Sequence, residues 1–312
     1  MGTYLWGRAL RAIPVLFGVS LLVFSMLYLL PGDPATLMLG ESTAASAEAV
    51  ERLRERLGLN ESFYVQYWRF VSRAVRGDLG TSITTNQPVT EMIFAVLPST
   101  VELTLAAMFT AVVVGVTLGV LAAVRRNTWL DSVSILIASL GVSMPIFWLG
   151  LILIYVFSIQ FGWFPVVGQG GWKRLVLPAV ALGLGAAGVI ARLVRSSLLE
   201  VLRQEYMQTA RAKGLRERAV VVRHGLRNAL VPVVTIIGLQ FGALLGGAFI
   251  TETVFSRQGI GRLAVNAILR KDFPLVQGTV LLTAAIYVVM NLLVDVAYAI
   301  LDPRIRYKNG KG

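Results

Sequence analysis

The sequence predicts an all-α protein that crosses a membrane several times. Of its 312 residues, 56% are hydrophobic and only 15% are charged, whereas soluble domains carry roughly a quarter charged residues. Several apolar stretches continue for about 20 residues, which is the length that a helix needs to cross the hydrocarbon core of a bilayer. The chain has no cysteine, so a disulfide framework and a thiolate metal site are both excluded.

Six apolar stretches have the length of a membrane span, and each reads as helix. We therefore predict six transmembrane helices, near residues 13–30, 101–124, 133–161, 175–194, 230–250 and 280–301. The first stretch is too long for a signal peptide and is followed by no small-x-small cleavage site, so we expect a retained anchor. It ends at residues 31–34, where two prolines prevent the helix from continuing.

Lys and Arg are concentrated in the short segments on one side of these predicted spans. These segments are the N-terminus, the loop at Arg125, the loop 195–229 and the C-terminal tail. Basic residues beside membrane ends mark the cytoplasmic side, so we predict that both termini are cytoplasmic. The same placement accounts for the net charge of +12 and argues against nucleic acid as a partner.

The segment 32–98 is polar and too long for a simple connector. Val50, Leu53 and Leu57 form one helical stripe, and five residues from Tyr64 to Val75 form another. Residues 88–97 predict a short third helix that ends before Pro98. We expect a small α-helical external segment, whose aromatic stripe either packs against the membrane surface and the other helices or receives an external partner.

The residue types of a catalytic centre are missing from the usual spacings. His224 is the only histidine, and the sequence contains neither a Gly-x-x-x-x-Gly-Lys phosphate loop nor a Gly-x-Ser-x-Gly elbow. We therefore expect no enzyme activity, no metal and no cofactor in this chain. An ion-coupled carrier needs acids deep within its spans. Glu102 lies at the start of a span, and Asp295 is close enough to the basic end to pair with Arg304 or Arg306.

The loop 195–229 carries the strongest functional signal. Residues 196–212 read as a helix, and Gly214 follows it as a terminator. Basic residues alone would fit attraction to anionic lipids. However, the small residues at the tip, among them Thr209, Ala210 and Ala212, favour docking into a groove of another protein.

Glycines also recur every four residues in the fifth predicted span, at Gly238, Gly242 and Gly246, and once in the second, at Gly115 and Gly119. Such a ridge lets another helix approach closely. We expect helix packing there, and sliding at a subunit interface is the functional alternative.

Two strings in this loop, EYMQTARAKGL at 205–215 and HGLRNALVP at 224–232, resemble the permease subunits of ATP-binding-cassette importers in the dipeptide, oligopeptide and nickel branch. The wider superfamily begins this loop with Glu-Ala-Ala, whereas Gln208, Thr209 and Ala210 occupy that register here. The role of that acid is therefore not carried over. The resemblance extends to LPGDP at 30–34, GLQFG at 238–242 and DPRIR at 302–306. The large external segment is similar to that of the first of the branch's two permeases, and the short loop after Phe161 is more like that of glutathione and short-peptide members.

The resemblance implies alternating access. Two homologous permeases form the path, and two ATPase subunits, which bind ATP and Mg²⁺, drive it from the cytoplasm. An external substrate-binding protein would dock partly on the segment 33–97. The implied ATPase contacts are Glu205, Tyr206, Thr209, Ala210, Arg211, Ala212, Lys213 and Gly214.

The implied domain organisation is an N-terminal segment and first span at 1–31, an external segment at 32–98, a permease domain at 99–301 and a cytoplasmic tail at 302–312, in a bacterial or archaeal inner membrane. An ion-coupled carrier, a scaffold without transport, and an importer of nickel or another solute stay open as alternatives. Path-lining residues and the identity of the peptide are not specified by the sequence.

Overall fold

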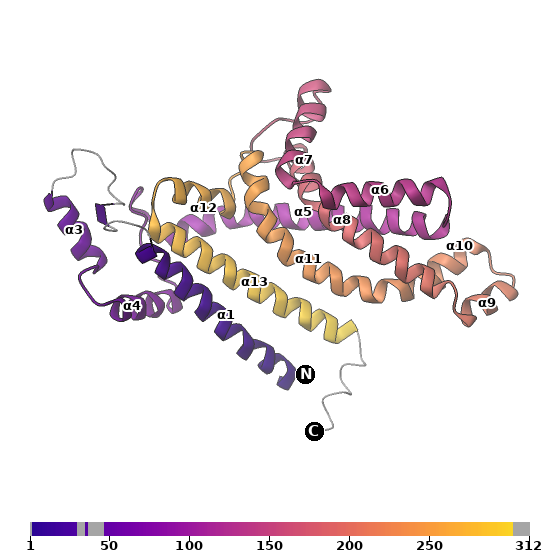
Figure 1. The fold of residues 1–312 in the computed structure, drawn as a ribbon, viewed down its shortest axis with the longest axis horizontal. Helices are drawn as coiled ribbons and strands as arrows, with labels where there is room; N and C mark the ends of the chain where they lie inside the picture. Colours follow the sequence, from indigo (N-terminus) through magenta and orange to yellow (C-terminus); the bar gives the residue numbers. More distant parts are fainter. Residues whose placement is uncertain (1, 30–34, 37–46, 302–312) are drawn as a thin grey trace. The chain divides into compact units, whose positions relative to one another are not determined.

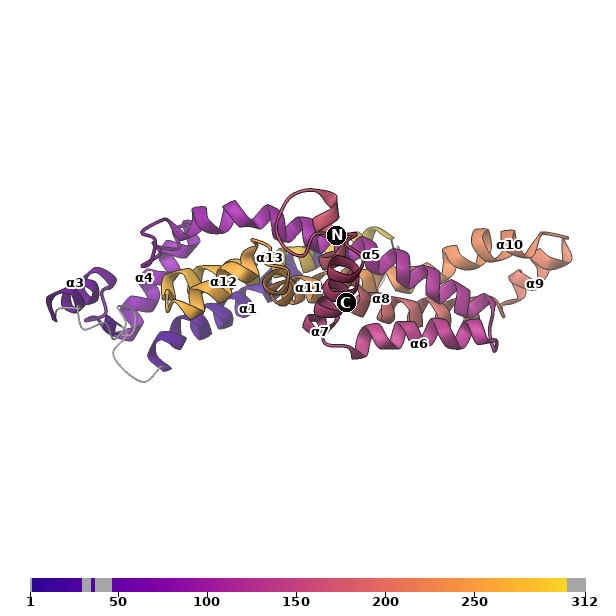
Figure 2. The same ribbon diagram turned by 90° about the horizontal axis from the view of Figure 1, so that it is seen from above.

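The computed structural model describes residues 2–29, 35–36 and 47–301, in which helices are the main regular structure (Figures 1 and 2). The predicted exit of the first span at 31–34 and the predicted tail 302–312 lie outside the described residues. The chain divides into two compact units. The first contains Ser99–Gln258 with 290–301, and the second contains Gly2–Pro98 with Gly259–Val289.

The first unit is built around α8 (Trp172–Val201), which packs against its neighbours through small residues. The other elements of this unit are α5 (Val89–Val124) from Ser99 onward, α6 (Trp129–Ser143), α7 (Ile146–Leu153), the π-helix η1 (Ile154–Gln160), α9 (Glu205–Ala212), α10 (Glu217–Ala219), the π-helix η2 (Val220–Leu226) and α11 (Arg227–Val254). Leu103, Ile190 and Val233 lie at the centre of its core and are fully buried.

Glycines let α8 approach α5 and α6 closely. A Cβ at Gly188 would lie 2.1 Å from the carbonyl oxygen of Ala138 in α6, and one at Gly119 would lie 2.6 Å from that of Ala191 in α8. Real Cβ atoms essentially never come so close, so these positions accept only glycine without backbone movement. The close packing expected at Gly115 and Gly119 is confirmed, because a Cβ at Gly115 would lie 2.7 Å from the carbonyl oxygen of Ala187.

The predicted single span 133–161 is wrong as one helix. It is broken after α6, and the helical segment that follows, α7 with η1, is bent by 112° relative to α6 (Figure 1). Pro145 has no N–H to donate, and it forces the preceding residue away from helical geometry. Met144 accordingly has an extended backbone, with ψ 131°.

The second unit contains α1 (Gly2–Leu29), α3 (Ala47–Leu57), α4 (Phe63–Val75), the first turns of α5, α12 (Ile260–Leu269) and α13 (Phe273–Leu301) up to Val289. The two predicted amphipathic helices of the segment 32–98 are confirmed as α3 and α4. The predicted ending of a third helix before Pro98 is wrong, because α5 continues through this proline. The apolar pattern did not reveal α12, whose Ile260 and Ala267 pack against Val89 and Ile93 of α5.

Four described helices are long and apolar enough to cross a membrane: Val89–Val124, Trp172–Val201, Glu217–Val254 and Phe273–Leu293. The bent pair Trp129–Ser143 and Ile146–Gln160 makes a fifth if it counts as one span. The apolar part of α1, Leu10–Met26, is shorter than these.

Candidate coupling surface

The connection from α8 to α11, residues 202–226, is a small helical segment that contains α9, α10 and η2. We call this segment the bracket. The predicted helix 196–212 is interrupted, because α8 continues to Val201 and a turn at 202–204 precedes α9. The predicted stop at Gly214 is confirmed. Gly214 has φ +78°, a left-handed conformation that glycine adopts at little cost.

Apolar contacts hold α9 against η2 and the end of α8. Met207 is fully buried and Ala210 is 9% exposed, and both pack with Val220 of η2. Val201 and Leu202, at the end of α8, complete this cluster. Both views place α9 and α10 beyond the ends of α5 and α6, where α8 and α11 approach each other (Figures 1 and 2). Packed side chains therefore connect α9 directly to the end of α8 and to η2.

Polar contacts close the bracket. Arg211 donates from Nε to Glu217 Oε2 at 3.0 Å and from Nη2 to Glu217 Oε1 at 2.8 Å, and it also donates to the carbonyl oxygen of Leu202. Asn228 of α11 donates to the hydroxyl oxygen of Tyr206 at 2.9 Å. The guanidinium of Arg211 lowers the pKa of Glu217, and the carboxylate in turn raises the pKa of Arg211.

Most of the residues predicted to contact an ATPase lie together on the outer side of this bracket. Ala210 is the exception, because its side chain belongs to the buried cluster. The exposed ones are Glu205, Tyr206, Thr209, Arg211, Ala212, Lys213 and Gly214. Arg211 has a structural partner in Glu217, which the sequence analysis did not single out. Arg211 and Glu217 are six residues apart, and side chains at this spacing do not share one face of a helix. The sequence therefore gives no sign of the pair, which only the fold reveals.

A second ion pair, between Asp131 and Arg195, also escaped the sequence analysis. Asp131 lies in the first turn of α6, is 6% exposed, and accepts two hydrogen bonds from Arg195 of α8. It accepts a third from the backbone N–H of Asn127 at 3.1 Å. A lone acid at the start of an apolar stretch was the available signal, but nothing in the sequence identified its partner.

The three glycines of the fifth predicted span differ in their surroundings. Gly242 is buried in α11. Gly246 is exposed, and among the described residues no atom lies within 4 Å of where its Cβ would be. The neighbouring Gly247 is the one that faces α8, since its Cβ would lie 2.8 Å from Leu182 Cδ1. A role of Gly238, Gly242 and Gly246 at a subunit interface stays a prediction.

The acids considered for an ion path have local partners where they are described. Glu102 accepts from Arg257, whose side chain is 2% exposed. Glu252 of α11, which the sequence analysis did not consider, is fully buried and accepts from the hydroxyl of Thr100 at 2.6 Å. The side chain of Asp295 lies outside the described residues, and so do Arg304 and Arg306. Within the part of the chain that the structure describes, no three His, Asp or Glu side chains form a group suited to a metal ion.

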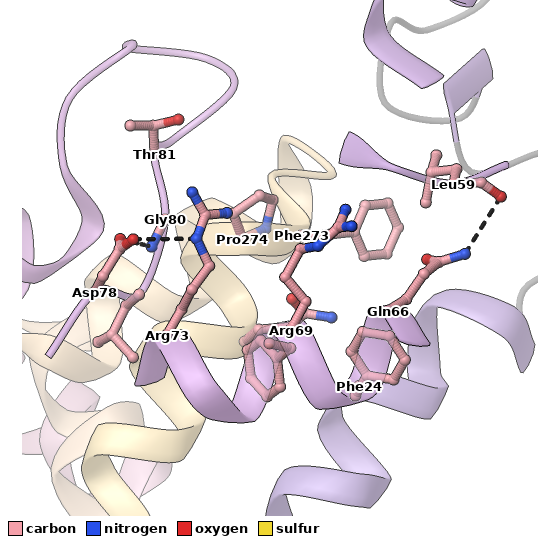
Figure 3. Close-up of a pocket in the computed structure, with 13 residues that line it drawn as sticks. Phe24, Leu59, Gln66, Arg69, Arg73, Asp78, Gly80, Thr81, Phe273 and Pro274 are labelled. Atoms are coloured by element: carbon pink, nitrogen blue, oxygen red, sulfur yellow. Dashed lines mark hydrogen bonds and ion pairs between the residues drawn. The ribbon is translucent and has the colours of Figure 1, made fainter. Parts of the chain in front are cut away.

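The second unit holds a rigid loop beside a cavity. Asp272 is 1% exposed and accepts from the hydroxyls of Ser82 and Thr84 at 2.5 and 2.8 Å, which fastens the loop 81–88 to the start of α13. A cavity of about 460 Å³ lies next to it (Figure 3). Arg69 and Arg73 project from α4 into this cavity and pair with Glu61 and Asp78.

Comparison with known proteins identifies the family. Residues 115–307 match the binding-protein-dependent transport system inner membrane component, and residues 1–104 match the N-terminal component of the same systems. The chain belongs to this family. It is a permease subunit of an ATP-binding-cassette importer, and it resides in the inner membrane.

Similarity to individual permeases extends over nearly the whole length. The glutathione transport system permease protein GsiC of Escherichia coli is 47% identical over 308 residues, which cover 99% of this chain and 100% of the relative. The protein of the same name from Shigella flexneri is 46% identical with the same coverage.

Solved structures support the fold of the permease. An inward-facing form of the MetNI methionine ABC transporter aligns with a TM-score of 0.55 and 22% identity, covering 68% of this chain and 96% of that one. An amino acid ABC transporter aligns with a TM-score of 0.52 and 19% identity, covering 69% and 94%. At such identities the likeness concerns the fold alone.

Proposed function

We propose that this permease subunit serves the uptake of short peptides, with glutathione as the first candidate. The observation that carries this proposal is the 47% identity to a glutathione permease over essentially the full length of both chains. Dipeptides, longer peptides and nickel chelates belong to the same branch that the loop 205–232 resembles, so they are the alternatives against which glutathione is tested.

The complete importer would contain this chain, a second homologous permease, two ATPase subunits and an external binding protein. This chain would supply half of the path and no catalytic site, with ATP and Mg²⁺ bound by the ATPases. The absence of a phosphate-binding loop from the sequence supports that division of labour.

In this importer α9 would be the coupling helix. Its outer side carries the predicted ATPase contacts. Its inner side is fixed through Met207 to Val220 and to the end of α8. ATP-driven closure of the ATPases would therefore move α8 and α11 together, which changes the access of the path from one side of the membrane to the other.

We further propose six spans with both termini in the cytoplasm. The six are α1, α5, the bent pair of α6 with α7 and η1, α8, α11 and α13. Counting α1 is supported by its length, because its 28 residues extend for about 42 Å, more than the hydrocarbon thickness. Residues 32–98 would then be external, and the bracket around α9 cytoplasmic.

Reconstitution tests the substrate and the energy source together. The chain would be co-expressed with the second permease and the ATPases encoded beside it, placed in liposomes and supplied with the loaded binding protein. We expect uptake of radiolabelled glutathione that requires ATP and is unaffected by ionophores. Uptake of a dipeptide or a nickel chelate in place of glutathione would overturn the substrate proposal, and uptake driven by an ion gradient without ATP would overturn the mechanism.

A further inference from the structure

The helix α4 presents three different faces. The first packs against α1 through aromatic side chains. Phe24 of α1 meets Phe63, Tyr67 and Phe70 of α4 with ring centroids 5.3 to 5.5 Å apart, and Tyr67 also contacts Phe17 at 6.0 Å. This face is a fixed protein contact.

The second face is apolar but exposed. Tyr64, Trp68, Val71 and Val75 recur at intervals of four, three and four residues, so they form one stripe along the helix. The residues Tyr64, Trp68 and Val75 are 81%, 73% and 83% exposed, and Val71 between them is half-buried. This stripe lies next to the face that packs on α1, so the two together make one continuous apolar surface.

The third face is basic. Arg69 and Arg73 are four residues apart in α4, on a different side of the helix from the exposed apolar stripe, and Arg76 follows directly after the helix as its C-cap residue. Arg69 and Arg73 project into the cavity of Figure 3. The charges of α4 are therefore turned away from Tyr64 and Trp68.

The contacts with α1 determine where α4 lies. Phe17, Ser20 and Phe24 all fall within the apolar stretch Leu10–Met26 of α1, and each touches α4; the hydroxyls of Ser20 and Tyr67 are 2.8 Å apart. On the same stretch, Leu22 is 70% exposed and Met26 is 50% exposed. The exposed apolar face of α4 therefore lies beside the apolar stretch of α1 that also exposes Leu22 and Met26.

We propose that the face formed by Tyr64, Trp68, Val71 and Val75 is immersed in the membrane, at the boundary between lipid headgroups and acyl chains. Tyr and Trp are the side chains that concentrate at this boundary, since they combine an apolar ring with a polar tip. The three arginines complete an interfacial amphipathic helix, with their charged ends among the phosphates and in water. A docking protein in the aqueous phase would meet the arginine face and the cavity instead. The lipid contact requires only that the chain is embedded in a membrane and does not depend on the substrate.

The natural lack of cysteine allows a direct test. Tyr64→Cys and Trp68→Cys would each carry a nitroxide label in the assembled importer in liposomes. Arg76→Cys, directly after the same helix and also exposed, is the matched control for water, and Leu22→Cys on α1 is the reference for lipid. ATP hydrolysis by each labelled complex verifies its assembly.

We expect the labels at 64 and 68 to resemble the label at 22, with a ratio of oxygen collisions to chromium oxalate collisions about fivefold higher than at 76, as for an interfacial helix. Equal ratios at 64, 68 and 76 would place the stripe in water and overturn the proposal. Protection of both labels from both reagents would mean that a protein subunit covers the stripe, which would also overturn it. Two independent positions keep the result decisive if one variant fails to assemble.

Discussion

Arg195 holds Asp131 with two parallel hydrogen bonds, Nε to Oδ1 at 2.7 Å and Nη2 to Oδ2 at 2.8 Å. The pair joins the first turn of α6 to α8, less than two turns before α8 ends at Val201. It therefore fixes the position of α8 immediately before the bracket that carries α9.

Replacing Arg195 with Ala should destabilise the permease. The substitution leaves the carboxylate of Asp131 buried without its cation, and breaking a buried pair costs about 3 kcal/mol at the low end of the usual range, since Arg195 keeps some solvent contact. Thermal unfolding in detergent should show a lower midpoint. The double variant Asp131→Asn/Arg195→Gln should lose less stability than the sum of the losses in the single variants Asp131→Asn and Arg195→Gln. Additive losses would mean that the pair does not interact.

The pair of Arg211 and Glu217 should order the bracket locally and only weakly. Both side chains are partly exposed, so the pair contributes about 0.2–1 kcal/mol, and Glu217→Gln should speed hydrogen exchange in α9 by about 1.5- to 5-fold. Because the pKa of Glu217 is lowered, the contribution is present above the unfolded pKa and is lost as the pH falls through the folded pKa. Exchange in the parent, corrected for intrinsic rates, should therefore show no loss of this pair between pH 8 and pH 6.

The double charge reversal Arg211→Glu/Glu217→Arg separates the two roles of Arg211. Compared with Glu217→Gln, the double variant should recover slow hydrogen exchange in α9, since the pair is restored. If Arg211 also contacts an ATPase, ATP-driven uptake by the double variant should be lower than uptake by the parent. Uptake by the double variant at the parental rate would remove Arg211 from the predicted ATPase contacts.

Gly214→Asp should abolish uptake while leaving expression near that of the parent. The backbone at Gly214 is left-handed, and no atom lies within 4 Å of where its Cβ would be, so the change introduces local strain and a negative charge beside Lys213 without disturbing a core. ATP hydrolysis should no longer respond to the loaded binding protein. Parental uptake with normal stimulation by the binding protein would show that this turn is not part of the coupling element.

Two glycine substitutions should separate folding from assembly. Gly188→Ala places a methyl 2.1 Å from the carbonyl oxygen of Ala138, so it should cost about 1–3 kcal/mol or more and reduce the yield of folded chain. Gly246→Ala meets no described atom and should change stability by less than about 0.5 kcal/mol. If Gly246 faces the second permease, co-purification of that subunit should fall in Gly246→Ala alone, and unchanged co-purification would contradict an interface at this glycine.

Labelling of single cysteines should establish the orientation. Ser62 precedes α4 and Ser196 lies near the end of α8, and both are exposed. In intact cells a membrane-impermeant maleimide should label Ser62→Cys and not Ser196→Cys, and permeabilised cells should label both. The reverse pattern in intact cells would invert the proposed topology.

The predictable part of this fold follows from local pattern. The apolar runs identified the main helices, and the stripes at Val50 and Tyr64 identified α3 and α4, because burial of one face imposes a helical period on the sequence itself. The small residues and Gly214 identified the tip of the bracket for the same reason, since the end of a helix has local sequence requirements.

What the sequence did not specify depends on pairs of residues distant in the chain. Asp131 and Arg195 are 64 residues apart, and Asp272 and Ser82 are 190 apart, so no local period connects them. The prolines illustrate the same limit. Pro145 breaks the third apolar stretch, whereas Pro178 and Pro232 lie inside continuous helices. Whether a proline ends a helix depends on neighbours that can satisfy the freed carbonyl, and those neighbours come from the fold.

The continuity of α8 gives it the mechanics of a lever. It runs unbroken for 30 residues, which is about 45 Å at the rise of an α-helix. A rotation of about 5° around one end of a rod of that length displaces the other end by about 4 Å, close to the 5.4 Å pitch of one helical turn. Because glycines bring α8 against the backbones of α5 and α6, a rotation of α8 would carry the three helices together. If α9 is the coupling helix proposed above, a small displacement there would reach the other end of α8 without being absorbed along the way.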